Sequence, residues 1–399
     1  MTAPFRNILQ ASRGWTRKHI KTPRQGNHTA HTNKLARAFP PVLIAVGVIG
    51  TATYYALAPT RYKALNSDTF TPYTITSREP ISPTSVIFTI SPQQHGPSLP
   101  YLLPGSTAWR YPLWSVEFKQ PEVQIARHYT PLPPADGDKT QDGTLSFYIR
   151  AVGGGEMSNY LNRQGVGCHV HLRGPHTGLD ILGRLGGRNK VVFLAGGTGV
   201  VPGMQVAKAV LERDATSTVK LLWAVRRRGE LQRRRDDGGK RPWWDFGGNA
   251  APTELTADVE EPSAMGKRLA RMKATYGERL VILVAVDEER TRFTEGDLRH
   301  VLRADGRAPP GLGCRLHDQR LHTRASEFEA PGTECQCSPA DDPGKNLLVV
   351  SGPEGFIAHY AGDKMWLDGT LTQGSVGGVA GELQRKDPSL ANDWLVLKL

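Results

Sequence analysis

The pattern of apolar and polar residues changes along the chain and predicts two kinds of folded domain. Between residues 68 and 185, short apolar or alternating runs are separated by Pro and Gly, which is typical of antiparallel strands joined by turns. We therefore expect an antiparallel β-barrel or sandwich in this region. Its predicted strands are Phe70–Thr76, Ser85–Ser91, Trp114–Glu117, Val123–Tyr129, Leu145–Val152 and Cys168–Arg173.

From residue 189 the pattern changes to buried strands that alternate with helices. Five apolar residues, Val191–Ala195, stop at a glycine turn, and helix-type spacing follows. Repetition of this alternation predicts a doubly wound parallel sheet over residues 189–399. Further strands are expected at Val219–Val225, Leu280–Val286, Asn346–Ser351 and Asp393–Leu399, and helices at Gly203–Arg213 and Gly266–Tyr276.

Two segments, near residues 226–259 and 303–343, fit neither pattern. Both are rich in Arg, Gly, Pro and Asp, so we expect solvated insertions at loops of the sheet. The first also carries Trp243 and Trp244, and a basic loop with tryptophans could instead dock an acidic partner or an anionic membrane surface.

The N-terminal region predicts a cellular location. No acidic residue precedes Asp68, and residues 1–38 combine many Lys and Arg with Ser, Thr and His, which is typical of a mitochondrial transit segment. A nucleic-acid-binding arm is the alternative. Residues 39–58 are free of charge and close to the roughly 20 residues of a transmembrane helix, although a buried soluble helix is also compatible. We predict an inner-membrane anchor, a body in the intermembrane space, and no nucleic-acid partner.

The turn after Val191–Ala195 is the first candidate binding site. It carries Gly196, Gly197, Thr198 and Gly199, and Pro202 follows in the expected helix. Glycines let a ligand approach the backbone, and a helix start directs N–H groups and positive partial charge to one place. The turn therefore suits a phosphate or pyrophosphate, with a tight turn that binds no ligand as the alternative. Its spacing matches neither the dinucleotide fingerprint nor the Walker A pattern.

Three other segments at strand ends add candidate ligand contacts. Arg127, Tyr129 and Thr130 end a predicted barrel strand, where an arginine can pair with a pyrophosphate and the other two can face a planar heterocycle. The glycine turn with Gly155, Met157 and Ser158 opens a short helix and can hold a second phosphate. The third segment, Ser351-Gly352-Pro353, lies at the expected carboxyl edge of the parallel sheet.

In this order, the segments resemble the ferredoxin-reductase type of flavoprotein, and its cytochrome b5 reductase branch in particular. The resemblance implies that the segments at residues 127–130 and 155–161 hold FAD, and that the segment at residues 196–202 begins a domain for NADH or NADPH. The family usually has cysteine at the position of Ser351, which puts the rate of hydride transfer in doubt. Arg226–Arg228 follow the strand where the adenosine ribose should lie, and they suit either a 2′-phosphate or solvent, so the donor stays open.

The transit segment, the apolar run and the reductase body together resemble fungal mitochondrial flavoproteins that assist haem attachment to cytochrome c, as does the run Val286–Glu289. This implies an FAD-dependent NAD(P)H oxidoreductase that reduces haem before its attachment, with cytochrome c and the attachment machinery as partners. The alternatives are a cytochrome b5 or quinone-type reductase, or a degenerate flavoprotein that acts as an assembly or docking factor. We assign no catalytic acid or base, because hydride transfer to flavin requires none.

Cysteine and histidine residues gather in the second insertion. Cys314, His317, His322, Cys335 and Cys337 are soft ligand types for zinc. Their spacing fits no standard site, because Cys335 and Cys337 are closer in sequence than the usual pair. We therefore predict no metal site, and we expect free thiols or a disulfide.

Overall fold

The computed structural model describes residues 65–93, 113–134, 143–232, 251–304, 313–329, 333–338 and 343–399. The predicted transit segment and the apolar run at residues 39–58 lie outside these residues, so both stay predictions. In the part of the chain that is described, no helix is both long enough and apolar enough to cross a membrane.

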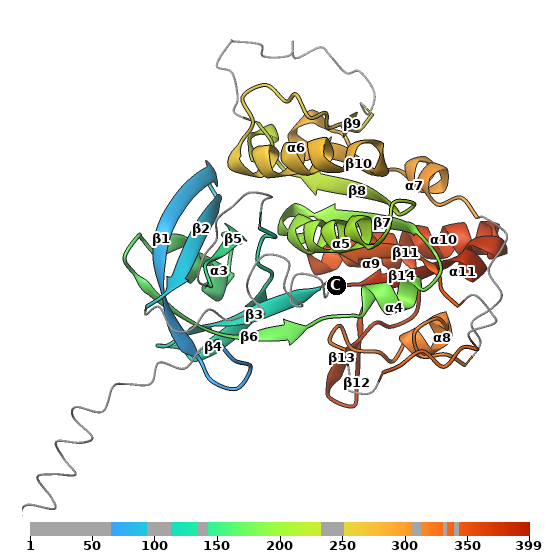
Figure 1. Cartoon of the computed structure of the whole chain (residues 1–399), viewed down its shortest axis with the longest axis horizontal. Helices are drawn as coiled ribbons and strands as arrows, with labels where there is room; N and C mark the ends of the chain where they lie inside the picture. Colours follow the sequence, from blue (N-terminus) through green and yellow to red (C-terminus); the bar gives the residue numbers. More distant parts are fainter. Residues whose placement is uncertain are drawn as a thin grey trace, which may run out of the picture. The chain divides into compact units, whose positions relative to one another are not determined.

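The first domain is a six-stranded antiparallel sheet with the strand order β4-β3-β6-β1-β2-β5 (Figure 1). Its elements are β1 (Thr71–Ser82), β2 (Ser85–Pro92), β3 (Trp114–Gln120), β4 (Ile125–Tyr129), β5 (Leu145–Arg150), α3 (Glu156–Arg163) and β6 (His169–Thr177). All six predicted strands are confirmed, with shifted ends. The edge strands β4 and β5 form no ladder with each other among the described residues. A hydrogen bond from Leu132 N to Ser146 O (2.8 Å) nevertheless draws the chain after β4 onto β5.

Alternation along the strands gives the first domain its core. Buried and half-buried residues alternate at every position of β3, as a sheet with one packed face requires. The rings of Phe88, Phe118 and Phe147 meet in this core, and the centroids of Phe118 and Phe147 are 4.9 Å apart at an interplanar angle of 83°. This edge-to-face arrangement is a preferred geometry of aromatic pairs.

The second domain is a six-stranded sheet with the order β14-β11-β7-β8-β10-β9 (Figure 1). Its strands are β7 (Lys190–Gly196), β8 (Thr218–Val225), β9 (Thr253–Glu254), β10 (Leu280–Val286), β11 (Asn346–Ser351) and β14 (Trp394–Lys398). All neighbours are parallel except β9, which is antiparallel to β10. The predicted parallel sheet is therefore confirmed, together with its C-terminal strand.

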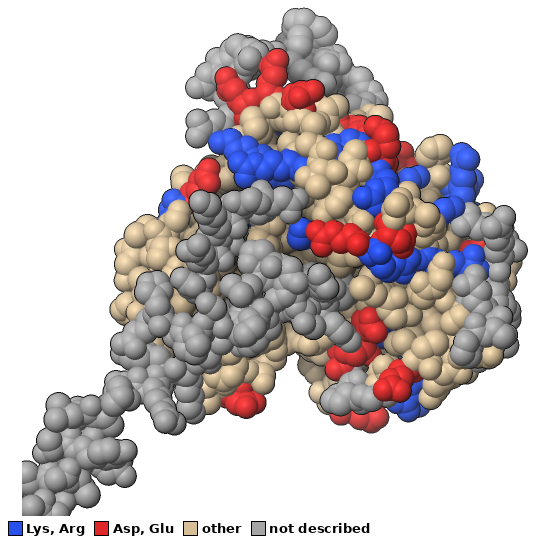
Figure 2. Space-filling model, viewed as in Figure 1, with Lys and Arg blue, Asp and Glu red and all other residues tan. Residues whose placement is uncertain are grey.

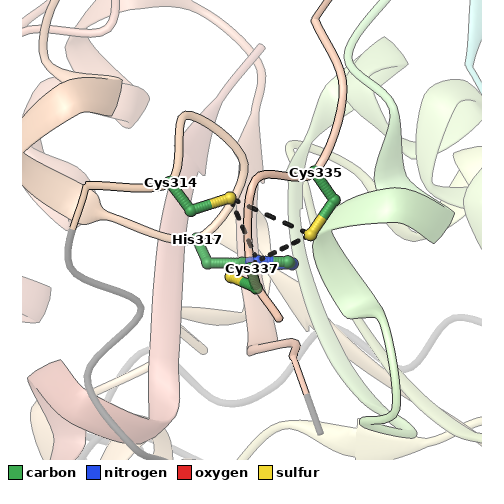
Figure 3. A group of neighbouring side chains, drawn as sticks. All are labelled: Cys314, His317, Cys335 and Cys337. Atoms are coloured by element: carbon green, nitrogen blue, oxygen red, sulfur yellow. Dashed lines mark hydrogen bonds between the residues drawn. The ribbon is translucent and has the colours of Figure 1, made fainter. Parts of the chain in front are cut away.

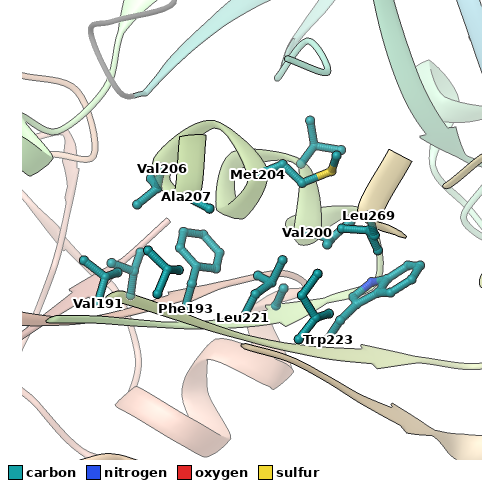
Figure 4. Close-up of a cluster of buried hydrophobic side chains, with 14 of the residues drawn as sticks. Val191, Phe193, Val200, Met204, Val206, Ala207, Leu221, Trp223 and Leu269 are labelled. Carbon is teal, nitrogen blue, oxygen red and sulfur yellow. The ribbon is translucent and has the colours of Figure 1, made fainter. Parts of the chain in front are cut away.

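Helices supply the apolar partners of both sheet faces. In β7, Val191 and Phe193 belong to one hydrophobic cluster, whereas Val192 and Leu194 belong to another. Figure 4 shows the first cluster, in which α5 packs on β7 and β8. Described helices that accompany this sheet include α5 (Val200–Arg213), α6 (Ala264–Tyr276), α7 (Glu295–Val301), α9 (Glu354–Ala361), α10 (Gly378–Lys386) and α11 (Pro388–Asp393). Burial on both faces explains the continuous apolar run of β7.

The buried amide of Gln205 connects the two sheets. This α5 residue is 3% exposed. Its Oε1 accepts a hydrogen bond from Trp114 N (3.1 Å), and its Nε2 donates one to Pro131 O (3.0 Å). The start of β3 and the segment that follows β4 are therefore both held against α5, the helix that follows β7 in the second domain.

The buried carboxylate of Glu230 makes a second connection. It is 1% exposed and accepts hydrogen bonds from Ser82 Oγ (3.1 Å), Ser85 Oγ (2.8 Å) and the Tyr148 hydroxyl. Burial, followed by the charge of Glu230, raises the pKa of Tyr148 well above its ordinary value, so this phenol stays a donor. Three hydroxyl groups thus satisfy a carboxylate that would otherwise be costly to bury.

The described parts of the second insertion are packed, which corrects the expectation of a solvated segment. Cys314, Leu316, His317 and His322 are all buried, the last at the end of α8 (Gln319–His322). Glu329 forms an ion pair with Arg184 of α4 (Ile181–Leu185) at 2.7 Å. Polar composition misled the prediction, because these residues find their partners in α4 and in one another. The adjoining hairpin comprises β12 (Met365–Leu367) and β13 (Thr370–Thr372).

The net charge of +12 is unevenly distributed, because many basic residues precede Asp68. On the face shown in Figure 2, Lys and Arg side chains are interspersed with Asp and Glu side chains. The described part of this face therefore presents both signs of charge side by side.

Candidate functional site

The first two predicted binding segments line one cavity. A space of about 330 Å³ lies between β4 and the turn that precedes α3. Its lining comprises Ile125, Arg127, Tyr129, Val152, Gly154, Gly155, Glu156, Met157 and Ser158. Arg127 and Tyr129 reach it because they are two positions apart on β4 and so share one face of the sheet. The structure therefore brings together residues that are nearly thirty positions apart in the sequence.

The turn before α3 is shaped by its own hydrogen bonds. Ser158 Oγ accepts a hydrogen bond from Val152 N (3.2 Å) and donates one to Gly155 O (3.1 Å), while Asn159 Nδ2 donates to Val152 O (2.9 Å) and to Gly155 O (2.8 Å). Gly154 has a φ of +76°, which favours glycine. Within the described residues no side chain caps the N-terminus of α3. Its first N–H groups are consequently suited to an anionic ligand.

Two of these lining residues are anchored in the core of the first domain. The Met157 side chain is buried in the core of the first domain. The ring of Tyr129 packs edge-on against Phe118, with centroids 5.6 Å apart, and burial raises the pKa of Tyr129 to about 12. Tyr129 therefore stays a neutral hydrogen-bonding phenol at physiological pH. An exposed guanidinium, free helix N–H groups and a neutral phenol at one cavity fit the pyrophosphate and ring system of FAD.

The other two predicted segments meet at the carboxyl ends of β7 and β11. Ala195 pairs with Ser351 in the sheet, and the 3-10 turn Gly197–Gly199 follows β7. A Cβ added to Gly199 would lie 2.5 Å from Ser351 O, and one added to Gly196 would lie 2.9 Å from the Phe356 ring. These two glycines are thus required by the close approach of β11 and α9, which the sequence alone could not distinguish from ligand contact.

Gly197 has a different environment. Its φ is +56°, and the nearest atom to an added Cβ would be Arg150 Nη1 at 3.4 Å. Trp223 Nε1 donates to Gly197 O (2.8 Å), which fixes the turn from beneath. Gly197 and Thr198 are partly exposed, so they form the accessible part of this turn. A dinucleotide pyrophosphate would meet the protein here.

Arg150 is a site residue that the sequence analysis missed. It ends β5, immediately before the turn of the first cavity, and its guanidinium lies beside Gly197 of the second domain. Only its place next to a glycine-rich turn could have drawn attention to it. This cation stands between the two candidate half-sites, where anionic ligand groups would gather.

The remaining predicted residues are placed as follows. Thr130 is the residue after β4, Ser351 is buried at the end of β11, and Pro202 is buried in the first turn of α5. Gly352, with a φ of +150°, approaches Gly196, and Pro353 precedes α9. Their ligand contacts stay predictions.

The arginine run after β8 is only partly available to a ligand. Arg226 and Arg227 are exposed. Arg228 forms an ion pair with Glu289, with Nε donating to Oε1 at 2.7 Å, and its backbone N–H donates to Glu288 Oε1 at 2.7 Å. Hydrogen bonding to Glu289 raises the pKa of Arg228 above its ordinary value. The acidic run after Val286 therefore occupies one of the three arginines proposed for a 2′-phosphate.

Comparison with known proteins identifies the class. Residues 72–180 match the family of oxidoreductase FAD-binding domains. These residues therefore form an oxidoreductase FAD-binding domain, and the chain is similar to cytochrome b5 reductases, which supports FAD and NAD(P)H as its cofactors.

Two fungal proteins and one solved structure are among the proteins similar to this chain. The cytochrome c mitochondrial import factor of Saccharomyces cerevisiae is 29% identical over 186 residues, which cover 43% of this chain and 48% of the relative. An uncharacterized FAD-binding protein of Schizosaccharomyces pombe is 29% identical over 178 residues, which cover 44% of this chain and 60% of the relative. The chain thus spans about half the length of these relatives. The cytochrome b5 reductase domain of Ulva prolifera nitrate reductase aligns with a TM-score of 0.41 at 18% identity, covering 73% of this chain and 90% of that domain.

Proposed function

We propose that this protein is an FAD-dependent NAD(P)H oxidoreductase that passes electrons to haem or cytochrome c during cytochrome c maturation. The observation that carries the proposal is the placement of Arg150. This residue ends β5, two positions before Val152 in the lining of the FAD-type cavity, and it lies beside Gly197, the accessible glycine of the second domain. Two ligand sites on different domains thus share one border, as transfer between two bound cofactors requires.

The protein's residues bind and orient, and the cofactor supplies the redox chemistry. When bound, FAD accepts a two-electron hydride and donates electrons singly. Arg127 and the first N–H groups of α3 neutralise the flavin pyrophosphate, while Tyr129 contacts its ring or ribityl chain. Gly197 and Thr198 hold the pyrophosphate of the nicotinamide nucleotide. Gln205 and Glu230 keep the two half-sites in register, because both are buried and each is bonded to the first domain.

The acceptor and the location are inferred from the N-terminal region and from one relative. The composition of residues 1–38 and the uncharged run at residues 39–58 favour import into mitochondria and an inner-membrane anchor, with the body facing the intermembrane space. The relative named as a cytochrome c mitochondrial import factor supports haem or cytochrome c as acceptor.

A second function is favoured by one departure at the site. Ser351 replaces the usual cysteine of the resembled family, so a flavoprotein that no longer reacts with NAD(P)H and acts in assembly or docking is the alternative. A cytochrome b5 or quinone-type reductase would share the same site and differ only in acceptor.

Acceptor preference tests the proposal. The full chain, reduced anaerobically and then freed of excess nucleotide, should be mixed in a stopped-flow instrument with ferric haem, ferric cytochrome c, ferric cytochrome b5 or a soluble quinone. We expect haem or cytochrome c to reoxidise the flavin at least about tenfold faster than the others, a barrier difference of about 1.4 kcal/mol. If cytochrome b5 or the quinone reoxidised the flavin faster, haem and cytochrome c would be rejected as the acceptor.

A further inference from the structure

Four side chains of metal-ligand type converge outside the candidate nucleotide segments. They come from the second insertion, and their ligand atoms all lie within 4.8 Å of one another. Figure 3 shows the four side chains pointing toward a common centre. They are Cys314, His317, Cys335 and Cys337.

The distances match those of a tetrahedral metal centre. His317 Nδ1 lies 3.5 Å from Cys314 Sγ, 3.8 Å from Cys335 Sγ and 3.3 Å from Cys337 Sγ, and the sulfurs of Cys314 and Cys335 are 4.0 Å apart. Tetrahedral zinc with bonds of about 2.3 Å to sulfur and about 2.05 Å to nitrogen requires separations of about 3.6 Å for sulfur–nitrogen pairs and about 3.8 Å for sulfur pairs. These four separations agree with the required values within a few tenths of an ångström, and the other two sulfur pairs lie within 4.8 Å.

The imidazole of His317 is held in the orientation that a ligand needs. Its Nε2 donates a hydrogen bond to Gly183 O of α4 at 3.0 Å. The proton is thereby fixed on Nε2, and the lone pair of Nδ1 is directed at the three sulfurs. Metal-bound histidines characteristically donate their second ring nitrogen to a carbonyl or carboxylate in this way. Cys314 Sγ also accepts a hydrogen bond from Gln336 N at 3.4 Å, which suits a thiolate.

We propose that these residues form a structural Zn²⁺ site of the Cys3His type. Three thiolates and one imidazole in tetrahedral array select zinc, and four protein ligands leave no open position for catalysis. The one-residue separation of Cys335 and Cys337 is tighter than in standard zinc sites and predicted no metal. In the structure that spacing is compatible with a shared metal, since the other two ligands arrive from a separate turn around residues 314–317.

The site would fasten the second insertion to α4. A metal bound there joins the start and end of the segment at residues 314–337, and His317 attaches it to Gly183. Between these ends, the Phe328 ring lies 4.7 Å from the ring of His128, which neighbours the two cavity residues on β4. Zinc would therefore hold the insertion against the strand that carries Arg127 and Tyr129.

Metal content tests the assignment directly. The full chain should be purified without a histidine tag, dialysed under reducing conditions, and analysed by inductively coupled plasma mass spectrometry. We expect about one zinc per chain, and about 0.1 or less in Cys314→Ser and Cys337→Ser variants. Cys168→Ser is the matched control, because Cys168 is the remaining cysteine and lies in the first domain outside the cluster. This variant should keep its zinc.

Two measurements on the unaltered protein keep the test valid if the variants fold poorly. Cobalt should replace zinc at one equivalent and give the visible absorption of tetrahedral cobalt thiolate, which requires the assembled ligand set. Thiol titration should find one reactive cysteine in the zinc form and four after chelation. Stoichiometric iron in place of zinc, a disulfide among these cysteines in the intact mass, or absence of both zinc and the cobalt spectrum would overturn the proposal.

Discussion

Replacement of Gln205 by leucine tests whether the two domains are fixed in register by the buried amide. The substitution preserves the approximate size and apolar stem of the side chain but removes its polar atoms. Trp114 N and Pro131 O, both of buried residues, would lose the partners that now lie at 3.1 Å and 3.0 Å. Water cannot readily replace them, because Gln205 itself is 3% exposed.

The magnitude follows from these two groups. A buried donor or acceptor left without a partner costs about 1–3 kcal/mol, so two cost about 2–5 kcal/mol after partial relaxation. For a folded body of this size that corresponds to a fall in melting temperature of about 3–7 °C. Flavin reduction by NAD(P)H should slow by about tenfold or more, because small misplacements of reacting groups are costly. FAD content should be unchanged, since Gln205 does not line the first cavity.

Differential scanning fluorimetry, flavin content and anaerobic stopped-flow reduction measure these three effects. Glu212→Gln is the matched control, because it also changes α5 but removes the charge of an ion pair with Lys208, which is worth less than about 1 kcal/mol, while the amide oxygen can still accept the hydrogen bond from the Tyr276 hydroxyl. A Gln205→Leu protein with the wild-type melting temperature and the wild-type reduction rate would refute the proposed role of this amide.

Three further predictions concern ligand charge and pH. Arg127→Ala should weaken FAD binding about 10- to 100-fold by removing a charge-assisted contact, as measured by flavin retention on dilution; unchanged retention would remove Arg127 from the site. The wild type should prefer NADH, because the ion pair with Glu289 occupies Arg228. Glu289→Gln should free this arginine and raise the NADPH-to-NADH ratio of kcat/KM about 5- to 30-fold, which corresponds to about 1–2 kcal/mol. An unchanged ratio would show that the 2′-phosphate binds elsewhere. Burial acts to raise the pKa of Asp214, but hydrogen bonds from the turn at residues 216–217 lower it overall. The ionised carboxylate of Asp214 therefore stabilises the fold above its ordinary pKa of 3.8, and this stabilisation is lost as the pH falls further. In Asp214→Asn the melting temperature should consequently depend less on pH in the acid range. A melting temperature that falls with acid as steeply as in the wild type would contradict this.

The strands were predictable from sequence because their periodicities are unusually clear. The alternating β3 and the uniformly apolar β7 report one-sided and two-sided burial respectively. The turn residue Gly197 was also found, because a positive φ favours glycine. These features are local, so a single sequence contains them.

Contacts between distant segments were not predictable in the same way. Arg150 becomes a site residue only because the turn at Gly197 lies beside it, and Gly196 and Gly199 owe their identity to the approach of β11 and α9. The packed second insertion was missed for a related reason. Its polar composition is typical of solvated segments, and its convergent cysteines become visible only when two short stretches fold together.

The most direct test of the central claim is anaerobic absorbance titration of the full chain with NADH and NADPH in separate experiments. The proposed function predicts that the flavin absorption is bleached at about one equivalent of nucleotide, with NADH the faster donor. A protein that binds FAD stoichiometrically but is bleached by neither nucleotide would contradict the oxidoreductase assignment and would favour the docking-factor alternative.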